Sequence, residues 1–337
     1  MKNCVELILN WYIKNHRDLP WREDKDPYHI WISEIMLQQT RIEAVIEYYH
    51  RFMKRIPNIK TLSEIPEDEL LKLWEGLGYY SRARNLGKAA SIIMEKYHGV
   101  FPNTYQDILS LPGIGEYTAG AISSICFDLK EVAVDGNVMR VFCRVENKDL
   151  DVSDLKVKKE IGNTLKKILP KESGDFNQGI MELGETICIP NGIPKCDICP
   201  LNKHCLSHLH HTEESIPRKI EKNKKTEEVY TVLLLKYHDK IAIQRRETGL
   251  LKNMWEFPNL VGTLSVDEVK SVIPNIISIT ADISNTHIFT HKKWIMSSYV
   301  IEVSKKDNSY QWVSLDDLYS QYAIPTAFKP FLNILKK

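Results

Sequence analysis

Apolar residues recur every three or four positions from the start of the chain to about residue 205, which is the spacing of amphipathic helices. The first example is Val5, Ile8, Leu9 and Tyr12, which share one face of a predicted N-terminal helix. Short segments with Pro and Gly separate the helical runs, and strand-like alternation is nearly absent. Residues 1–206 are therefore predicted to form a mainly helical domain.

The pattern changes twice beyond the helical half. Residues 207–228 are polar and mixed in charge, which indicates a linker. Within them, PRKIEKNKK (217–225) carries five basic residues against one acidic residue, so it is either solvated surface or a contact for phosphate. Residues 229–337 show strand, turn and strand, then more strand and a helical end, which predicts a smaller α/β domain.

Composition and charge limit the classes of protein to which the chain can belong. A chain of 337 residues with ordinary composition favours two globular domains, and no apolar run approaches the ~20 residues of a membrane span. The N-terminus lacks the pattern of a signal peptide. A net charge of +1 argues against a protein that coats nucleic acid through charge alone. We expect a cytoplasmic protein with no membrane partner, which binds its partner through a shaped site.

Four of the 7 cysteines fall within CIPNGIPKCDICPLNKHC, at Cys188, Cys196, Cys199 and Cys205. Disulfides are rare in reducing compartments, so a metal centre is favoured. Zinc sites usually show two C-x-x-C pairs, and only one is present here. Four thiolates in one short loop suit an iron–sulfur cluster. Zinc stays an alternative because of the nearby histidines, which are His204, His208, His210 and His211.

A Pro-Gly-x-Gly turn opens a helix in LSLPGIGEYTAGAISSI (109–125). Its glycines permit positive φ and close backbone approach. The first N–H groups of the following helix can bind a phosphate without side chains. The alternative is a tight helical turn within a core.

Two carboxylates, Asp135 and Glu34, are candidates for catalytic groups. Asp135 precedes a helical run, where it caps the helix or faces a bound sugar. Glu34 lies on an apolar stripe that runs from Trp31 to Tyr49, where desolvation raises a carboxyl pKa and allows proton donation. The alternative for Glu34 is a buried structural carboxylate. One protonated and one ionised carboxylate together suit cleavage of a glycosidic bond.

These features occur in the order of the endonuclease III superfamily, and the chain resembles its MutY-type adenine DNA glycosylases. The motifs that carry the resemblance are HRDLPWR, WISEIMLQQT, EGLGYYSRARNL, LPGIGEYTAGAI, VDGNVMR, MELGETIC and the cysteines. The resemblance implies a helix-hairpin-helix glycosylase domain with a 4Fe–4S cluster. It also implies a nucleoid-associated monomer whose partner is duplex DNA with adenine opposite 8-oxoguanine or guanine.

The resemblance also implies roles for individual residues. Glu34 would protonate the adenine and Asp135 would stabilise the sugar cation, supported by Tyr117 and Asn137. The adenine pocket would consist of Arg17, Trp21, Arg22, Leu37, Ile42 and Glu182. The residues implied to contact DNA are Gln39, Thr40, Tyr79, Arg82, Gly113 and Gly115. The cluster would be bound by Cys188, Cys196, Cys199 and Cys205, with Gly192 in the one-residue-longer first gap.

The C-terminal half resembles the Nudix-related domain with which these enzymes recognise 8-oxoguanine. The resemblance rests on IAIQRRETGLLKNMWEFPNLVG and WVSLDDL…IPTAF. The segment VGTLSVDEVKSVIPNI lacks the Glu-rich metal box of a Nudix hydrolase, which implies a reader without hydrolase activity. Its recognition loop would contain Phe289, Thr290 and His291, with Thr290 in place of the usual Ser.

Two other functions compete with this one. An endonuclease III-like glycosylase and lyase for oxidised pyrimidines would need a nucleophilic lysine, and this chain has Tyr117 at that position. A DNA-binding or redox-sensing module would need neither Glu34 nor Asp135. A monofunctional adenine glycosylase is therefore the favoured hypothesis.

Overall fold

The computed structural model describes residues 1–218 and 224–335. The chain divides into two compact units. One unit contains Met1–Glu64 and Asn85–Glu221, and the other contains Ile65–Arg84 and Lys222–Lys337. Most of the basic stretch 217–225 lies outside the described residues.

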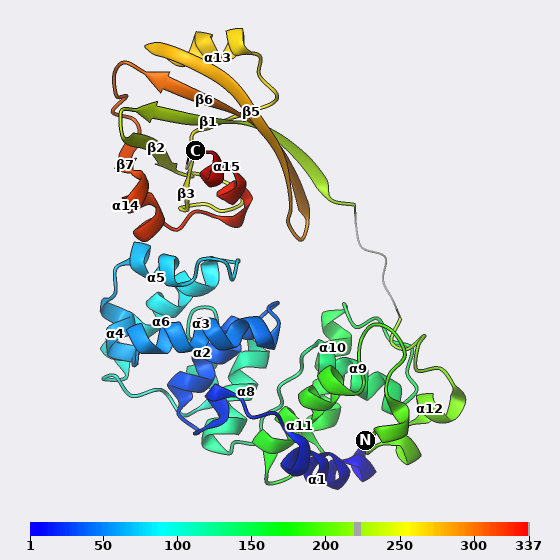
Figure 1. The fold of residues 1–337 in the computed structure, drawn as a ribbon. Helices are drawn as coiled ribbons and strands as arrows, with labels where there is room; N and C mark the ends of the chain where they lie inside the picture. Colours follow the sequence, from blue (N-terminus) through cyan, green and yellow to red (C-terminus); the bar gives the residue numbers. More distant parts are fainter. Residues whose placement is uncertain (219–223, 336–337) are drawn as a thin grey trace. The chain divides into compact units, whose positions relative to one another are not determined.

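Helices account for the regular structure that is described in the first unit, which confirms the predicted helical fold (Figure 1). The bounds are α1 Val5–Asn15, α2 Pro27–Leu37, α3 Ile42–Arg55, α4 Ile59–Glu64, α6 Ser81–Lys96, α7 Tyr105–Leu109, α8 Glu116–Phe127, α9 Gly136–Val145, α10 Leu155–Lys166, α11 Ser173–Thr186 and α12 Leu206–His210. Side chains of Asp26, Thr104, Asp135 and Asp154 cap four of these helices. Each cap accepts a backbone N–H that the helix itself leaves unpaired.

Helix α11 is central to the packing of this unit because it contacts α1, α8 and α9. Its apolar residues Phe176, Ile180 and Leu183 are buried together with Phe142 of α9. Gly179 permits a close approach, since a Cβ atom there would lie 2.9 Å from Ile8 of α1. The predicted N-terminal helix is confirmed, with Ile8 and Tyr12 buried.

The second unit contains a mixed sheet with strand order β3-β2-β1-β6-β5. Strands β4 and β7 pair with β1 and β2, and only β1 and β6 run parallel among the described pairs. The strand bounds are β1 Thr226–Tyr237, β2 Lys240–Arg245, β3 Trp255–Glu256, β4 Asn259–Val261, β5 Ile276–Ile288, β6 Lys292–Val303 and β7 Gln311–Ser314. The helices of this unit are α5 Glu67–Leu73, the start of α6, α13 Val266–Val272, α14 Leu315–Ser320 and α15 Lys329–Ile334.

Helices cover both faces of this sheet. Successive side chains of β1 point to opposite faces, so β1 contributes to two separate cores. Val232 and Leu234 join a core with residues of α14 and α15, whereas Leu233 and Leu235 join a core with α13. Figure 1 shows α13 on one face and α15 on the other. This arrangement confirms the predicted α/β class of the C-terminal half. Within the described residues, no helix combines the length and apolarity that crossing a membrane would require.

Candidate active site and cysteine loop

A cavity of about 400 Å³ lies among α2, α8, α9 and α11 of the helical unit. It brings together residues that are more than 100 positions apart in the sequence, such as Glu34 and Glu182. The predicted site residues that line it are Trp21, Arg22, Glu34, Leu37, Gln39, Thr40, Ile42, Tyr117, Asp135, Asn137 and Glu182. The structure therefore assembles most of the residues that the sequence singled out in this unit.

Glu34 is buried on α2, with 8% of its surface exposed. Its Oε2 atom has no hydrogen-bond partner among the described residues. Burial raises the pKa of Glu34 to about 7, and the charge of Asp135 adds to the rise, while Tyr117 and Arg22 oppose it. A carboxyl with this pKa holds a proton near neutral pH and can donate it to a group in the cavity.

Asp135 both caps α9 and lines the cavity, so the two interpretations of its position are compatible. One carboxylate oxygen accepts the Val138 N–H at 2.8 Å, and the other accepts the Asn137 side-chain amide at 2.9 Å. Burial raises the pKa of Asp135, while these two donors and the charge of Arg140 oppose the rise. The donors favour the ionised form of Asp135.

Arg140 connects this capped helix to the cysteine loop. Its guanidinium donates to Asn137 Oδ1 at 2.7 Å, to Gly184 O at 2.7 Å and to Cys188 O at 2.8 Å. Asn137 is thus fixed between Asp135 and Arg140. The position of the first loop cysteine is therefore linked to the position of the cavity carboxylate through two side chains.

Glu182 on α11 forms the second charged cluster of the cavity. It is 2% exposed, and it accepts hydrogen bonds from Arg17 Nε at 2.5 Å and Arg22 Nη2 at 2.9 Å. Burial alone would raise the pKa of Glu182, but the hydrogen bonds and charges of Arg17 and Arg22 outweigh it and lower the pKa. Arg17 therefore belongs to the site through Glu182, although it does not line the cavity.

The apolar stripe from Trp31 to Tyr49 is not one continuous helix. Helix α2 ends at Leu37, α3 begins at Ile42, and Gln39 adopts a positive φ of 59° in the turn between them. The side chains of the turn consequently face the cavity, where Gln39 and Thr40 form part of its wall. The helical spacing of the apolar residues concealed this break.

The predicted helix-hairpin-helix occupies α7, the turn 110–115 and α8. Gly113 has a φ of +80°, and a Cβ there would lie 2.7 Å from the Cβ of Asn85. Gly115 is the exposed N-cap of α8, and as a glycine it provides no side-chain cap hydrogen bond to the first N–H groups of the helix. Gly120 lets α8 approach the segment before Asp135, since a Cβ there would lie 2.0 Å from Val132 O.

The remaining predicted DNA contacts lie in the second unit. Tyr79 is 45% exposed, with a positive φ of 46°, and its hydroxyl forms a hydrogen bond with the Thr290 hydroxyl. Arg82 is buried instead of exposed. It donates to Leu77 O at 2.9 Å and Gly78 O at 3.1 Å, and burial lowers its pKa to about 10. In this structure, Arg82 holds the loop that presents Tyr79.

The predicted recognition residues occur at the turn between β5 and β6. Thr290 and His291 are exposed, whereas Phe289 is half-buried and its ring centroid lies 4.9 Å from that of Trp294. The aromatic contact anchors the turn to the sheet. Thr290 remains accessible at its tip.

The four loop cysteines lie close together, and none of the described cysteines forms a disulfide. Cys188, Cys196, Cys199 and Cys205 all line one small cavity, of about 20 Å³, that is walled by α9, α11 and the loop. Arg144 donates to Cys188 Sγ at 3.3 Å and to Ile189 O at 3.0 Å. Gly192 has a φ of +80° in the longer first gap. Burial raises the pKa of Cys196 to about 11 and that of Cys199 to about 12.

A convergent set of four thiols with a buried arginine beside it fits a cubane cluster. Thiols with raised pKa values become thiolates only when a strong positive charge is bound. The cluster would join the two ends of the loop beside α9 and α11, and it would supply no group to the cavity that holds Glu34.

Sequence reasoning missed several residues of the cavity wall. These are Leu19, Ile30, Arg41, Ile125, Gln178, Met181, Glu185 and Pro190. Helical spacing could have identified two of them, because Gln178 and Glu185 lie one turn before and after Glu182. The Tyr117 hydroxyl contacts Met181 Sδ at 3.2 Å, a pairing that no sequence pattern signals.

Comparisons with known proteins agree with this architecture. Residues 32–171 match the model of the HhH-GPD superfamily of base excision DNA repair proteins, and residues 230–333 match a NUDIX domain. A solved thermostable thymine-DNA glycosylase is 31% identical, with a TM-score of 0.57 over 62% of this chain and 96% of that one. Endonuclease III trapped covalently on DNA is 25% identical, with a TM-score of 0.54 over 63% and 96%. The first unit therefore has the fold of helix-hairpin-helix DNA glycosylases.

Curated relatives specify the family further. The adenine DNA glycosylase of Buchnera aphidicola subsp. Baizongia pistaciae is 37% identical over 98% of this chain and 96% of its own length. The mouse adenine DNA glycosylase is 35% identical over 75% of this chain and 59% of its own length. The chain belongs to the adenine DNA glycosylase family of enzymes.

Proposed function

We propose that the protein is a monofunctional glycosylase that removes adenine paired with 8-oxoguanine, or with guanine, from duplex DNA. The observation that carries the proposal is the pair of carboxylates in one cavity. Glu34 has a pKa of about 7, while Asp135 accepts two hydrogen bonds that favour its ionised form. Family membership supports the choice of adenine as the base.

In the proposed reaction, the adenine leaves the helix and enters the cavity, because a base within the stack is out of reach. Glu34 donates its proton to the base, which weakens the glycosidic bond. Asp135 stabilises the positive charge that develops on the sugar, and water completes the hydrolysis. The Arg17, Arg22 and Glu182 cluster orients the base through the polar groups of the pocket wall.

Matched amide variants test the two carboxylates. Glu34→Gln and Asp135→Asn should each lower the single-turnover excision rate by roughly 10²–10⁴-fold, the range of acid–base contributions, while DNA binding changes little. Glu43→Gln, which alters an exposed carboxylate on α3, is the control. Excision at the parent rate by either cavity variant would contradict the mechanism.

The absence of a lysine nucleophile supports hydrolysis without strand cleavage. Tyr117 stands at the lysine position, and its pKa is raised well above the usual range by burial and by Glu34. A neutral phenol is a poor nucleophile for a Schiff-base reaction, which requires an amine. Borohydride should therefore trap little of the protein on abasic DNA. Trapping at the level of a lysine-bearing lyase would favour the endonuclease III-like alternative.

The sheet unit is proposed to recognise the 8-oxoguanine, through Phe289, Thr290 and His291 at the β5–β6 turn. The helix α13, which stands at the place of a Nudix metal box, offers only Asp267 and Glu268 as carboxylates. Glu268 is used in a capping box with Ser265. The donor set of α13 therefore suits a reader and not a metal-dependent hydrolase.

We also propose that the cysteine loop holds a 4Fe–4S cluster through Cys188, Cys196, Cys199 and Cys205. The cavity they share and the contact of Arg144 with Cys188 support this assignment. Analysis of anaerobically purified protein should find iron and sulfide in equal amounts. Zinc alone, at one ion per chain, would contradict a cluster.

A further inference from the structure

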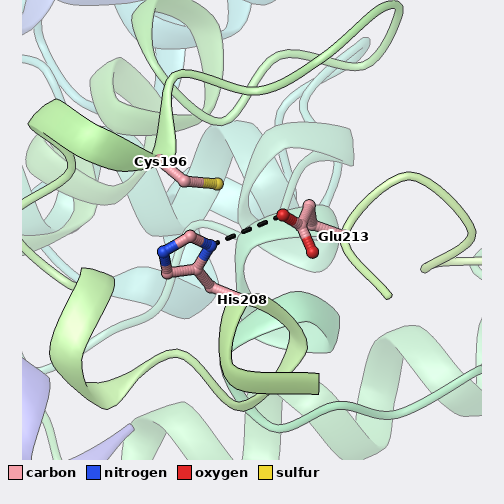
Figure 2. Close-up of side chains that lie close together, drawn as sticks. All are labelled: Cys196, His208 and Glu213. Carbon is pink, nitrogen blue, oxygen red and sulfur yellow. Dashed lines mark hydrogen bonds and ion pairs between the residues drawn. The ribbon is translucent and has the colours of Figure 1, made fainter. Parts of the chain in front are cut away.

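Three side chains with metal-binding atoms meet beside the cysteine loop, in an arrangement that the cluster does not explain. The Cys196 thiol, a His208 ring nitrogen and a Glu213 carboxylate oxygen all lie within 4.8 Å of one another. Cys196 begins the short helix η3 (Cys196–Ile198), His208 lies on α12, and Glu213 follows α12. Figure 2 shows the three side chains directed toward a common space.

His208 and Glu213 form a long ion pair, and their spacing also fits two ligands of one ion. His208 Nδ1 lies 3.4 Å from Glu213 Oε1. Hydrogen bonds between such atoms usually measure about 2.7–3.2 Å. By contrast, a tetrahedral zinc ion with bonds of about 2.0–2.2 Å places its nitrogen and oxygen ligands roughly 3.4 Å apart.

The second carboxylate oxygen of Glu213 provides an independent observation. Oε2 is buried and has no hydrogen-bond partner among the described residues. The Glu213 side chain as a whole is 18% exposed. A carboxylate oxygen that is removed from water without a donor is costly, and a bound cation removes that cost.

We propose that Cys196, His208 and Glu213 form a site for one divalent ion of the zinc class, which is filled when the loop holds no iron–sulfur cluster. Sulfur, nitrogen and oxygen donors together suit Zn²⁺, whereas Mg²⁺ and Ca²⁺ take oxygen ligands. Three protein ligands leave one position for water or for another loop cysteine. The ion would join η3 to α12 and keep the loop folded.

The two occupants exclude each other because each needs the Cys196 thiolate. His208 and Glu213 are required for the zinc-class site alone. Substituting them should therefore leave the iron content of cluster-loaded protein unchanged, which also shows that the variants fold. The proposal concerns the chain without its cluster and does not depend on glycosylase activity.

The test uses the full-length chain after the iron has been removed under reducing conditions. Zn²⁺ affinity is measured by competition with a chromogenic chelator, and Co²⁺ is bound as a spectroscopic substitute. His208→Ala and Glu213→Gln should each weaken binding by roughly tenfold or more, since even outer partners of metal ligands contribute ~10–100-fold to affinity. The Co²⁺ spectrum should show weak thiolate charge transfer in the parent, because few thiolates contact the ion.

Two neighbouring residues supply matched controls. His210→Ala alters an exposed histidine on the same helix, and Glu214→Gln alters the exposed carboxylate beside Glu213. Both controls should bind Zn²⁺ like the parent. If His208→Ala and Glu213→Gln also bind like the parent, or if Co²⁺ shows the intense charge transfer of four thiolates, the ion resides on the four cysteines and the proposal is wrong.

Discussion

Glu34 and Glu182 are buried glutamates of the same cavity, yet their surroundings move their pKa values in opposite directions. Burial is the largest influence on Glu34, and it raises the pKa to about 7. Glu182 lies between Arg17 and Arg22, and its pKa falls. The same cavity therefore favours the protonated form of Glu34 and the charged form of Glu182. This difference lets the cavity combine a proton donor with a fixed anion.

The pKa of Glu34 makes a prediction about stability that needs no DNA. The folded-state pKa of Glu34 lies above the ordinary value of 4.5. The carboxyl therefore contributes its full stability below pH 4.5, and this contribution is lost as the pH rises through about 7. Glu34→Gln should therefore be more stable than the parent, by up to about 3 kcal/mol, above pH 7. Urea unfolding from pH 6 to 8 should show this advantage growing toward pH 7 and then levelling off. An advantage that is constant over that range would contradict the raised pKa.

The Glu182 cluster predicts a loss of stability. Removal of the carboxylate leaves the half-buried Arg17 and Arg22 without their shared partner. Glu182→Ala should cost about 2 kcal/mol, which is less than for a fully buried pair because both arginines are partly exposed. Glu185→Ala is the control, since its 39% exposed side chain should contribute about 0.5 kcal/mol or less. Equal losses for the two variants, measured by urea unfolding, would exclude the proposed importance of the cluster.

The sequence singled out several residues that the structure places in one cavity. Glu34, Asp135 and Glu182 each stand in a motif, and the fold brings them to one cavity. The environment of Arg82 could not be foreseen, because two of its partners are backbone carbonyls whose positions depend on the loop conformation. A motif shows that an arginine is present, but it does not show whether its side chain is exposed to solvent.

Close helix packing sets the position of Asp135 in the cavity. Helix α8 approaches the segment before Asp135 at Gly120, where no side chain fits. Asp135 then begins α9, whose Arg140 reaches the cysteine loop. The hairpin, the carboxylate and the loop therefore form one connected arrangement.

A methyl group at Gly120 should disturb this arrangement. Its Cβ would overlap Val132 O at 2.0 Å, so Gly120→Ala should destabilise the fold by about 1–3 kcal/mol and slow excision by moving Asp135. Gly162→Ala on α10 is a matched control, because its Cβ would lie in ordinary contact at 3.6 Å from Val134. Thermal unfolding and single-turnover excision measure the two effects. Normal behaviour of Gly120→Ala would show that the contact does not position Asp135.

Element boundaries were predicted less well than element types. The apolar periodicity from Trp31 to Tyr49 indicated one stripe, but the backbone turns at Gln39 through a positive φ. Periodicity could not reveal the turn because Ile42 continues the buried face after it. The strands of the C-terminal half were easier, since Val232 to Leu235 are buried on alternating faces of a two-sided sheet.

The whole molecule combines a helical glycosylase unit with a sheet unit, and the β5–β6 turn of the sheet unit carries the proposed recognition residues. Thr290 should contribute to preference for 8-oxoguanine and not to chemistry. Thr290→Val removes the hydroxyl at constant size, and it should reduce the preference for 8-oxoguanine over guanine opposite the adenine by roughly tenfold, the value of about one hydrogen bond. Thr286→Val on the exposed surface of β5 is the control. An unchanged preference in competition assays would exclude Thr290 as a recognition residue.

The proposed function requires that two carboxylates in the helical unit excise adenine and that the base opposite the adenine sets the rate. Its most direct test is single-turnover excision on duplexes with adenine opposite 8-oxoguanine, guanine, cytosine or thymine, followed by alkali to reveal abasic sites. We expect the fastest excision opposite 8-oxoguanine, slower excision opposite guanine and little opposite cytosine or thymine, with each rate roughly 10²–10⁴-fold lower in Glu34→Gln. Excision that ignores the opposite base, or that continues at the parent rate in Glu34→Gln, would contradict the proposed function.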